Sequence, residues 1–375
     1  MKRYKILFIA SFPPPIHGSS VVSEQIRSSK VINDAFQGDY VNFGTSRKMD
    51  EIGKGGLWLN IKKLFRFAGS FFKTFWMLTA HRYDLCYLAI TCHGAGFLKD
   101  APFVLLCKMF GRKIVIHQHN KGMSKDVDRP IYKWLLPMVY KNAKVILLSW
   151  HLYPDIEKVV KKENVMICPN GIKPTVDPSF ERKPHKIPHI LFLSNLLIDK
   201  GVLVLLDALK ILKDKGYSFV CDFVGSETKD IDASRFAKEV ESRGLNQLAI
   251  YHGRKYGADK DAYFKQADIF AFPTFYDNET FGLVNLEAME YKLPIISTNI
   301  GGIPDVVVNG ENGFATQPEN ADSIVCSLCK LLDDSSLRKK MGEDGYRKYK
   351  SKFTDICFET KLVDVLKSAI GGGVE

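Results

Sequence analysis

The sequence predicts an α/β protein built from two doubly wound, Rossmann-like domains, each around a parallel sheet. Short apolar runs rich in Ile, Val, Leu and Phe recur in both halves, and segments with a helical repeat separate them. The runs do not alternate apolar with polar residues, which is typical of parallel strands buried on both faces. A charged stretch with four prolines, PTVDPSFERKPHKIP at 174–188, divides the chain of 375 residues.

The apolar runs give the expected strands in order. In the first half they are YKILFIAS, DLCYLAI, KIVIHQH and KVILLS, and in the second half HILFLS, FVCDFVG, LAIYHG, DIFAFPT and LPIISTN. Segments such as GVLVLLDALKILKDKG supply the helices between them. We therefore expect domains at 1–177 and 188–352, followed by an amphipathic helix within 353–375 that packs back on the first domain.

The positive charge is concentrated in the first half of the chain. Residues 1–180 hold 27 Lys/Arg and 13 Asp/Glu, a net +14, whereas residues 181–375 hold 26 and 29, a net −3. A basic half favours an anionic neighbour, such as a membrane surface, a phosphate-bearing substrate or a nucleic acid, although it is also compatible with a solvated face. No nucleic-acid recognition module is present in it, so we expect no nucleic-acid partner.

Cysteine usage and the first residues indicate a cytoplasmic protein. Eight scattered cysteines form no disulfide framework, and the pair Cys326 and Cys329 lies in a helical, apolar segment that predicts buried thiols rather than a metal or redox site. The opening MKRYKILFIASFPPP has a basic start, but its apolar run is short and no cleavage-site pattern follows. We interpret it as the first buried strand, and no stretch of 18 residues is apolar enough to span a bilayer.

Residues 57–83 form a segment rich in aromatic and basic residues. Aromatic residues and leucines alternate there with Lys62, Lys63, Arg66, Lys73 and Arg82. The pattern fits a helix that rests on an anionic membrane interface, and it equally fits a helix packed on the sheet with its lysines facing water. Peripheral contact with the inner face of the cell membrane is therefore one of two open interpretations.

Candidate ligand-binding residues follow the predicted strands, where open α/β sheets bind their ligands. Gly18 opens a Gly/Ser turn before a helix, and Lys200 stands at another helix entrance, so both suit a phosphate. The stretch ETFGLVNLE places Glu279 in a loop and Glu287 about one turn into a helix. Gly282 between them allows a ligand to approach the backbone, and a carboxylate accepts two hydrogen bonds from vicinal hydroxyls of a ribose.

Seven pieces in one order resemble a known family. They are Gly18, PNGI at 169–172, DKG at 199–201, FVGSE at 223–227, ADIFAFPT at 267–274, ETFGLVNLE at 279–287 and GGIPDVVVNGENGF at 301–314. The chain resembles the retaining, nucleotide-sugar-dependent glycosyltransferases of the GT-B fold, the large group that builds bacterial polysaccharides, lipopolysaccharide and glycolipids. The resemblance is sharpest in the second half and weak over residues 40–110. It implies two Rossmann-like domains facing a central cleft, with the acceptor on the first and the nucleotide sugar on the second.

The resemblance also implies roles for individual residues. Glu279 matches the first glutamate of the Glu-x7-Glu motif, beside the reacting centre, and Glu287 matches the second, which holds the ribose. Lys200 matches the basic residue on the diphosphate, and His119 resembles the histidine that closes over the donor sugar, with His117 as second choice. The backbone N–H groups of Phe281, Gly282 and Leu283 match those that meet sugar and phosphates.

Three positions depart from the family pattern. Asn195 stands where a second diphosphate-binding arginine is usual, so Arg254 or Lys255 is a candidate substitute. Thr280 replaces the usual glycine and Lys173 the usual aspartate. None of these removes the glutamate pair, although Asn195 leaves the phosphate site one positive charge short.

The expected function is therefore that of a hexosyltransferase. We expect transfer from a nucleotide sugar, UDP-linked rather than GDP-linked, to a saccharide or lipid-linked saccharide, with neither cofactor nor metal. The two Asp-x-Asp triplets, 126–128 and 230–232, are too loose a pattern to indicate a metal site. Two alternatives stay open: a UDP-sugar 2-epimerase of similar fold, and a non-catalytic partner in a polysaccharide assembly complex, for which Asn195 is the hint.

Overall fold

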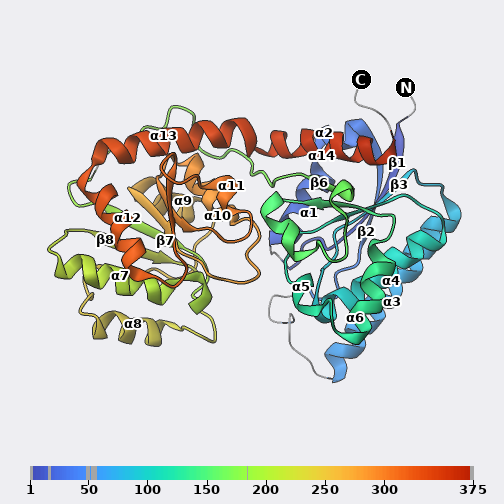
Figure 1. Ribbon diagram of the computed structural model, residues 1–375, viewed down its shortest axis with the longest axis horizontal. Helices are drawn as coiled ribbons and strands as arrows, with labels where there is room; N and C mark the ends of the chain where they lie inside the picture. The colour runs from blue at the N-terminus through green and yellow to red at the C-terminus, as the bar shows by residue number, and fades with distance from the viewer. Residues whose placement is uncertain (1–2, 16–17, 48–50, 52–56, 184, 372–375) are drawn as a thin grey trace. The chain divides into compact units, whose positions relative to one another are not determined.

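The computed structural model confirms an α/β fold with two parallel sheets (Figure 1). It describes residues 3–15, 18–47, 51, 57–183 and 185–371. The chain divides into two compact units, the first made of residues 1–170 and 355–375 and the second of residues 171–354. Each unit contains one six-stranded sheet whose paired strands all run parallel.

The sheet of the first unit has the order β2-β1-β3-β4-β5-β6. Its strands are β1 (Tyr4–Ala10), β2 (Phe36–Asn42), β3 (Leu85–Leu88), β4 (Ile114–His117), β5 (Lys144–Leu147) and β6 (Val165–Ile167). The central strands β3 and β4 are buried along their whole length, as the continuous apolar runs predicted. Because β1 pairs with both β2 and β3, the strand order reverses beside β1, and the crevice at its carboxyl end is the place where doubly wound sheets bind ligands.

Helices cover both faces of this first sheet. They are α1 (Gly18–Ser28), α2 (Lys30–Ala35), α3 (Leu57–Ala80), α4 (Gly94–Met109), α5 (Met123–Asp126), α6 (Pro130–Tyr140) and α14 (Asp355–Ile370), with 3₁₀ turns at Trp150–Asp155 and Lys162–Asn164. One core cluster joins α1, α2 and α14 to the sheet, for example through Ile26, Phe358 and Phe8. Figure 1 shows α3, α4 and α6 together, away from α2 and α14.

The sheet of the second unit has the order β12-β11-β10-β7-β8-β9. Its strands are β7 (His189–Leu193), β8 (Val220–Val224), β9 (Ala249–Tyr251), β10 (Ile269–Phe272), β11 (Ile295–Thr298) and β12 (Gly313–Thr316). Here the order reverses between β7 and β10, which are hydrogen-bonded neighbours. The carboxyl ends of these two strands therefore mark the ligand-binding crevice expected for this unit.

The second unit is closed by helices from its own segment of the chain. They are α7 (Val202–Asp214), α8 (Ala233–Ser242), α9 (Gly257–Gln266), α10 (Leu283–Glu290), α11 (Ile303–Val306), α12 (Ala321–Asp333) and α13 (Ser335–Lys352), with a 3₁₀ turn at Ile198–Lys200. The apolar faces of α7 and α12 pack together on the sheet, where Leu205, Leu209 and Leu328 are fully buried with Phe192. Their 3.6-residue repeat accounts for this packing.

The unit boundary differs from the expected one at 177. Residues 171–177 belong to the second unit because they are hydrogen-bonded into it. The carboxylate of Glu290 accepts hydrogen bonds from the backbone N–H groups of Thr175 and Val176. The hydroxyl of Tyr349 donates a hydrogen bond to the carbonyl of Ile172 at 3.2 Å. The chain returns to the first unit at Asp355, the first residue of α14. In this helix, the carboxylate of Glu359 accepts a hydrogen bond from the hydroxyl of Ser29.

Two further expectations can be compared with the structure. The prediction of buried thiols is wrong for Cys326, which is exposed, and Cys329 is half-buried. Both lie on α12, whose buried face carries Ile324, Leu328 and Leu331 instead. Within the described part of the chain, no helix has both the length and the apolar character needed to cross a membrane.

Candidate functional site

The crevice of the second unit brings Lys200 and Glu279 together. Lys200 ends the 3₁₀ turn after β7, and Glu279 lies in the loop after β10. Since β7 and β10 are neighbours, their following loops meet, and Lys200 Nζ lies 2.6 Å from Glu279 Oε2. Both side chains are largely buried, at 15% and 11% exposure. The ammonium group also lies over the ring of Tyr276, 4.5 Å from its centroid.

Glu279 is also attached to the start of α10. Its Oε1 accepts the backbone N–H of Gly282 at 3.1 Å, and Leu283 is the first helical residue after Gly282. Gly282 has φ of +65°, in the left-handed region that favours glycine. The carboxylate thus lies at the N-terminal, positively polarised end of a helix and beside a lysine.

Glu287 lies further along α10 and has a partner that the sequence did not reveal. Its Oε2 lies 2.8 Å from Nζ of Lys260 in α9, and both side chains are about a quarter exposed. Each glutamate of the predicted pair therefore has its own lysine. Lys260 stands in a polar segment without a pattern, so only the packing of α9 beside β7 could identify it. Of the substitutes expected for the missing arginine, Arg254 stacks on Tyr256 at 4.3 Å.

The remaining predicted residues of this unit have different environments. Phe281 is buried, and its ring packs edge-on against Phe353 with centroids 5.9 Å apart, so its backbone N–H and not its ring is available to a ligand. Leu283 is half-buried and Asn195 is exposed. Asn285 was not predicted: its buried side-chain amide has no hydrogen-bond partner within the described part of the chain.

A glycine pair supports the loop that carries Glu279. Gly302 donates its backbone N–H to the carbonyl of Thr280 at 2.7 Å. Gly301 has φ of +57°, and a Cβ there would overlap the carbonyl oxygen of Glu279. Glycines in such a turn allow another segment or a ligand to approach the backbone closely. In the structure, the segment that approaches Gly301 is the glutamate loop itself.

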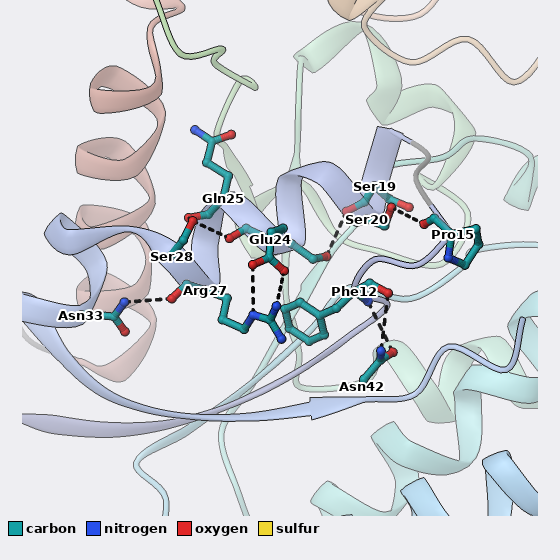
Figure 2. A network of polar contacts seen from close by, with 11 residues as sticks. Phe12, Pro15, Ser19, Ser20, Glu24, Gln25, Arg27, Ser28, Asn33 and Asn42 are labelled. Atoms are coloured by element: carbon teal, nitrogen blue, oxygen red, sulfur yellow. Dashed lines mark hydrogen bonds and ion pairs between the residues drawn. The ribbon is translucent and has the colours of Figure 1, made fainter. Parts of the chain in front are cut away.

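In the first unit, Gly18 is the first residue of α1, the helix that follows β1 beside the reversal of strand order. Figure 2 shows Ser20 of this helix beside Pro15, and Asn42 beside Phe12. Gly18 is exposed and a Cβ there would meet open space. The hydroxyl of Ser20 donates a hydrogen bond to the carbonyl of Pro15 at 2.9 Å. The side-chain amide of Asn42 accepts from the backbone N–H of Phe12 and donates to its carbonyl, both at 3.4 Å. These bonds hold the loop, so the first turn of α1 is presented at the carboxyl edge of the sheet.

The two candidate histidines lie at the end of β4. His117 is fully buried, with Nδ1 2.7 Å from the hydroxyl of Tyr87, and the ring of His119 lies over it with centroids 4.0 Å apart. Desolvation lowers the pKa of His119 to about 4, and desolvation together with the neighbouring His119 places the pKa of His117 well below its ordinary value. Both imidazoles are therefore neutral at pH 7.

The acidic triplets serve local structure. Asp126 accepts the backbone N–H of Gly94 and lies 2.8 Å from Arg129, while Asp232 caps α8 through the N–H of Arg235. Among the described residues, no group of three or more His, Cys, Asp or Glu side chains is arranged to hold a metal ion.

Residues 175–348 match the family of glycosyl transferases group 1. A capsular polysaccharide biosynthesis glycosyltransferase, CapM, of Staphylococcus aureus is 33% identical over 180 residues, covering 46% of this chain and 45% of the relative. A D-inositol 3-phosphate glycosyltransferase of Paenarthrobacter aurescens is 28% identical, covering 48% and 46%. The chain thus aligns with about half the length of these curated relatives.

Solved structures extend the similarity to the whole chain. A glycosyltransferase from Rickettsia africae superposes with a TM-score of 0.76 at 17% identity, covering 100% of both chains. Anabaena HepE in complex with UDP gives a TM-score of 0.77 at 18% identity, covering 97% of this chain and 100% of that one. At this identity the likeness establishes the GT-B fold for the chain, while the family match covers residues 175–348, a little under half of it.

Proposed function

We propose that this chain, whose second unit carries a group 1 glycosyltransferase domain in a GT-B fold, is a glycosyltransferase that acts in the synthesis of cell-surface polysaccharide or glycolipid. The donor is a nucleotide sugar, with UDP-sugar favoured, and the acceptor is a saccharide or a lipid-linked saccharide at the cytoplasmic side of the membrane. Relatives support these classes: one is a capsular polysaccharide enzyme, and the similar HepE structures contain UDP, UDP with glucose, or UDP-glucose.

The observation that carries the proposal is the contact between Lys200 and Glu279 at 2.6 Å. A lysine ammonium has three donors, so it can hold Glu279 and still donate to a diphosphate oxygen. The pair lies at the carboxyl ends of β7 and β10, where the strand order reverses, and the N-terminus of α10 lies beside it. This corner thus offers positive charge for a diphosphate and negative charge for an electron-poor sugar carbon.

In the proposed reaction, the bond between the anomeric carbon and the diphosphate oxygen breaks, and the leaving nucleoside diphosphate takes the electron pair. Lys200 and backbone N–H groups stabilise the negative charge that develops on it. The anomeric carbon becomes oxocarbenium-like, and Glu279 stabilises it or attacks it. The acceptor hydroxyl then forms the new bond on the face that the diphosphate left, and its proton passes to an oxygen of the departing diphosphate, so configuration is retained. No metal is needed in this scheme.

Two further residues complete the proposed site. Glu287 accepts hydrogen bonds from the ribose hydroxyls, and Lys260, 2.8 Å from it, fixes the orientation of its carboxylate. Lys260 also supplies a positive charge in this region, which partly offsets the asparagine at position 195. His119 contributes as a neutral imidazole, able both to donate and to accept a hydrogen bond with a sugar hydroxyl.

A thermal-shift screen with UDP, GDP, ADP and their sugars tests the donor class. A ligand at 100 times its Kd stabilises a protein by about 2.7 kcal/mol, enough to raise the melting temperature by several degrees. We expect UDP and one UDP-sugar to stabilise the protein, Glu287→Ala to abolish the shift, and Glu241→Ala, an exposed glutamate on α8, to keep it. Absence of any shift would reject the proposal and favour a non-catalytic partner of an assembly complex.

Product analysis separates the remaining alternatives. A transferase consumes UDP-sugar in proportion to acceptor and releases UDP, with the product anomer matching the donor. A 2-epimerase would instead convert UDP-sugar to its epimer without an acceptor, and that result would replace the proposed reaction.

A further inference from the structure

The tryptophans of this chain are distributed in an unusual way. All four lie in the first unit, and all are exposed: Trp58 by 76%, Trp76 by 62%, Trp134 by 64% and Trp150 by 45%. Tryptophan is normally highly buried, because its large ring gains more from leaving water than most side chains. Trp58 and Trp76 belong to α3 and Trp134 to α6, and both helices pack against α4. The exposed rings therefore indicate a surface with a partner.

Other apolar side chains extend this surface. We define the aromatic–basic face as the exposed apolar residues of α3, α4 and α6 with the exposed lysines among them: Trp58, Leu64, Phe65, Phe72, Phe75, Trp76, Met109, Ile131, Trp134 and Met138, with Lys62, Lys73, Lys133 and Lys141. On α3, Trp58, Phe65 and Phe72 follow one another at seven-residue intervals, which places them on one side of the helix. An apolar surface of this kind marks an interaction site more often than chance exposure.

The three helices form one platform. Phe103 of α4 packs edge-on against Phe67 and Phe71 of α3, with centroids 5.5 and 5.7 Å apart, and Phe75 packs against Phe110 at 5.7 Å. On the other side, Lys108 at the end of α4 donates to the carbonyls of Met138 and Lys141 at 2.6 Å. The ends of α3, α4 and α6 are thus fixed beside one another, and Figure 1 shows the three helices together.

The charges of this platform have one sign. The sequence has no Asp or Glu at 57–83, at 101–125 or at 129–154. The acidic residue within α4, Asp100, is buried and paired with Lys99 at 2.6 Å. An ordinary solvated helix surface mixes both signs, whereas here exposed lysines alternate with aromatic rings. The carboxylate that contacts α3, that of Glu51, is 17% exposed and is paired with Arg66 at 3.1 Å. Such a surface is complementary to a partner that is apolar inside and anionic outside.

We propose that the aromatic–basic face docks on an anionic lipid bilayer. The tryptophans and phenylalanines lie at the level of the headgroups, where amphipathic rings are enriched, and the lysines meet the lipid phosphates. The helix α3 rests on the interface, since Lys62, Lys63, Arg66 and Lys73 interrupt its apolar sequence and no described helix has the apolar length to cross. A lysine near an anionic surface contributes roughly a fivefold increase in binding, and the exposed rings add the apolar part.

This inference goes beyond the proposed reaction, and its test uses neither donor nor acceptor. The protein is mixed with vesicles of phosphatidylcholine alone or with about 30% phosphatidylglycerol and floated through a density gradient. We expect flotation with the anionic vesicles, weak flotation with the neutral ones, and partial release by raised salt, because screening weakens the charged part of the contact. Failure to float with anionic vesicles at low salt would overturn the proposal.

Matched variants locate the contact. The double substitution Lys62→Glu and Lys73→Glu should lower vesicle binding by at least about tenfold, whereas Lys210→Glu with Lys238→Glu, two exposed lysines of the second unit, should leave it within about twofold. Phe72→Ser with Trp76→Ser should lower binding even to vesicles at raised salt, and Trp150→Ser, an exposed tryptophan outside the three helices, should not. These positions are exposed, so circular dichroism should show every variant folded. Equal binding by test and control variants would contradict the proposed face.

Tryptophan fluorescence distinguishes a bilayer from a protein partner. Insertion into the interface should shift the emission to shorter wavelength, and lipids brominated near the headgroup should quench it. Trp150→Phe should keep the shift, and Trp58→Phe with Trp76→Phe should reduce it. Concentration-dependent self-association that Trp76→Ser abolishes, without vesicle binding, would assign the face to a second copy of the chain and overturn the proposal.

Discussion

The two units share a doubly wound parallel sheet and use it differently. In the second unit, the corner where strand order reverses holds a charged pair, Lys200 with Glu279. In the first unit, the corresponding corner holds the loop leading to Gly18, and β4 ends in two histidines without charge at pH 7. The outer surfaces differ as well: the first unit has 28 Lys/Arg and 16 Asp/Glu, a net +12, and the second has 25 and 26, a net −1.

In the two proposals made above, one architecture serves two tasks. A sheet fixes where loops converge, and the residues in those loops decide what is bound. The second unit concentrates charge inside its crevice, which suits the chemistry that we propose for it. The first unit carries its charge and its exposed rings on the outside of α3 and α6, which suits attachment.

The largest effect should come from removing the negative charge in the crevice of the second unit. Glu279→Gln keeps the shape of the side chain and should lower kcat by about 10³-fold, because the carboxylate no longer stabilises the positive charge of the reacting sugar. Steady-state transfer assays measure this loss, and thermal shift with UDP should show that the nucleotide still binds. Full activity of this variant would break the assignment of the chemistry to the second unit.

The next effect concerns the loop that supports this glutamate. Gly301→Ala forces a side chain into a left-handed φ and against the carbonyl of Glu279, so it should lower the free energy of unfolding of the second unit by about 2–4 kcal/mol. Gly310→Ala is the matched control: its φ is +83°, but a Cβ there meets nothing within 4 Å, so it should cost only about 1 kcal/mol. If denaturant unfolding gave the same loss of unfolding free energy for both variants, the strain in φ alone would account for it, and the contact with Glu279 would not.

Acidification should separate the units by stability. A folded-state pKa of about 4 for His119, below the ordinary 6.5, means that its contribution is fully present above pH 6.5 and is lost as pH falls from 6.5 towards 4. The expected loss for the first unit is about 1–3 kcal/mol. In the second unit, by contrast, His189 and His252 both contact the carboxylate of Asp222, at 3.3 and 2.7 Å.

Hydrogen exchange at pH 7, 6 and 5 measures this separation, since it follows the amides of each unit independently. His119→Phe should reduce the dependence of the first unit's stability on pH. Earlier loss of protection in the second unit would reverse the expected order.

The smallest effect should be a gain in the first unit. Gly69 lies exposed in the middle of α3, and a Cβ there meets nothing within 4 Å. Gly69→Ala should therefore stabilise the helix by up to about 1 kcal/mol, because alanine restricts the unfolded chain and favours helix. A higher melting temperature confined to the first unit would agree with this, and destabilisation would indicate a close contact at Gly69.

The sequence predicted the buried strands and one edge strand, β9, and missed the other three edge strands. β3, β4 and β10 are buried on both faces, so their apolar runs were recognisable. The strands that had no such signal, β2, β6 and β12, lie at the edges of the sheets. An edge strand is partly solvated, and FQGDYVN in β2 accordingly contains charged and polar residues that conceal its conformation.

The candidate site divides in the same way. Glu279, Glu287 and Lys200 stand in loops and helix starts that the strand pattern could place, and the contact of Lys200 with Glu279 follows once β7 and β10 are neighbours. Lys260 and Asn285 lie in predicted helical segments, Asn285 within ETFGLVNLE itself, but neither residue was assigned a role. Their surroundings depend on how α9 and α10 pack in the folded unit. The helical periodicity of a segment does not specify this packing.

The sequence by itself determined the fold class, the two-domain organisation and the glutamate motif, because burial periodicity and short-range turn chemistry are local properties of the chain. It also located the amphipathic helix at 57–83. Only the tertiary structure decided the strand order, the lysine partner of each glutamate and which aromatic rings of α3 and α6 stay in water. Those depend on contacts between residues far apart in the chain, such as Lys200 with Glu279 and Phe75 with Phe110.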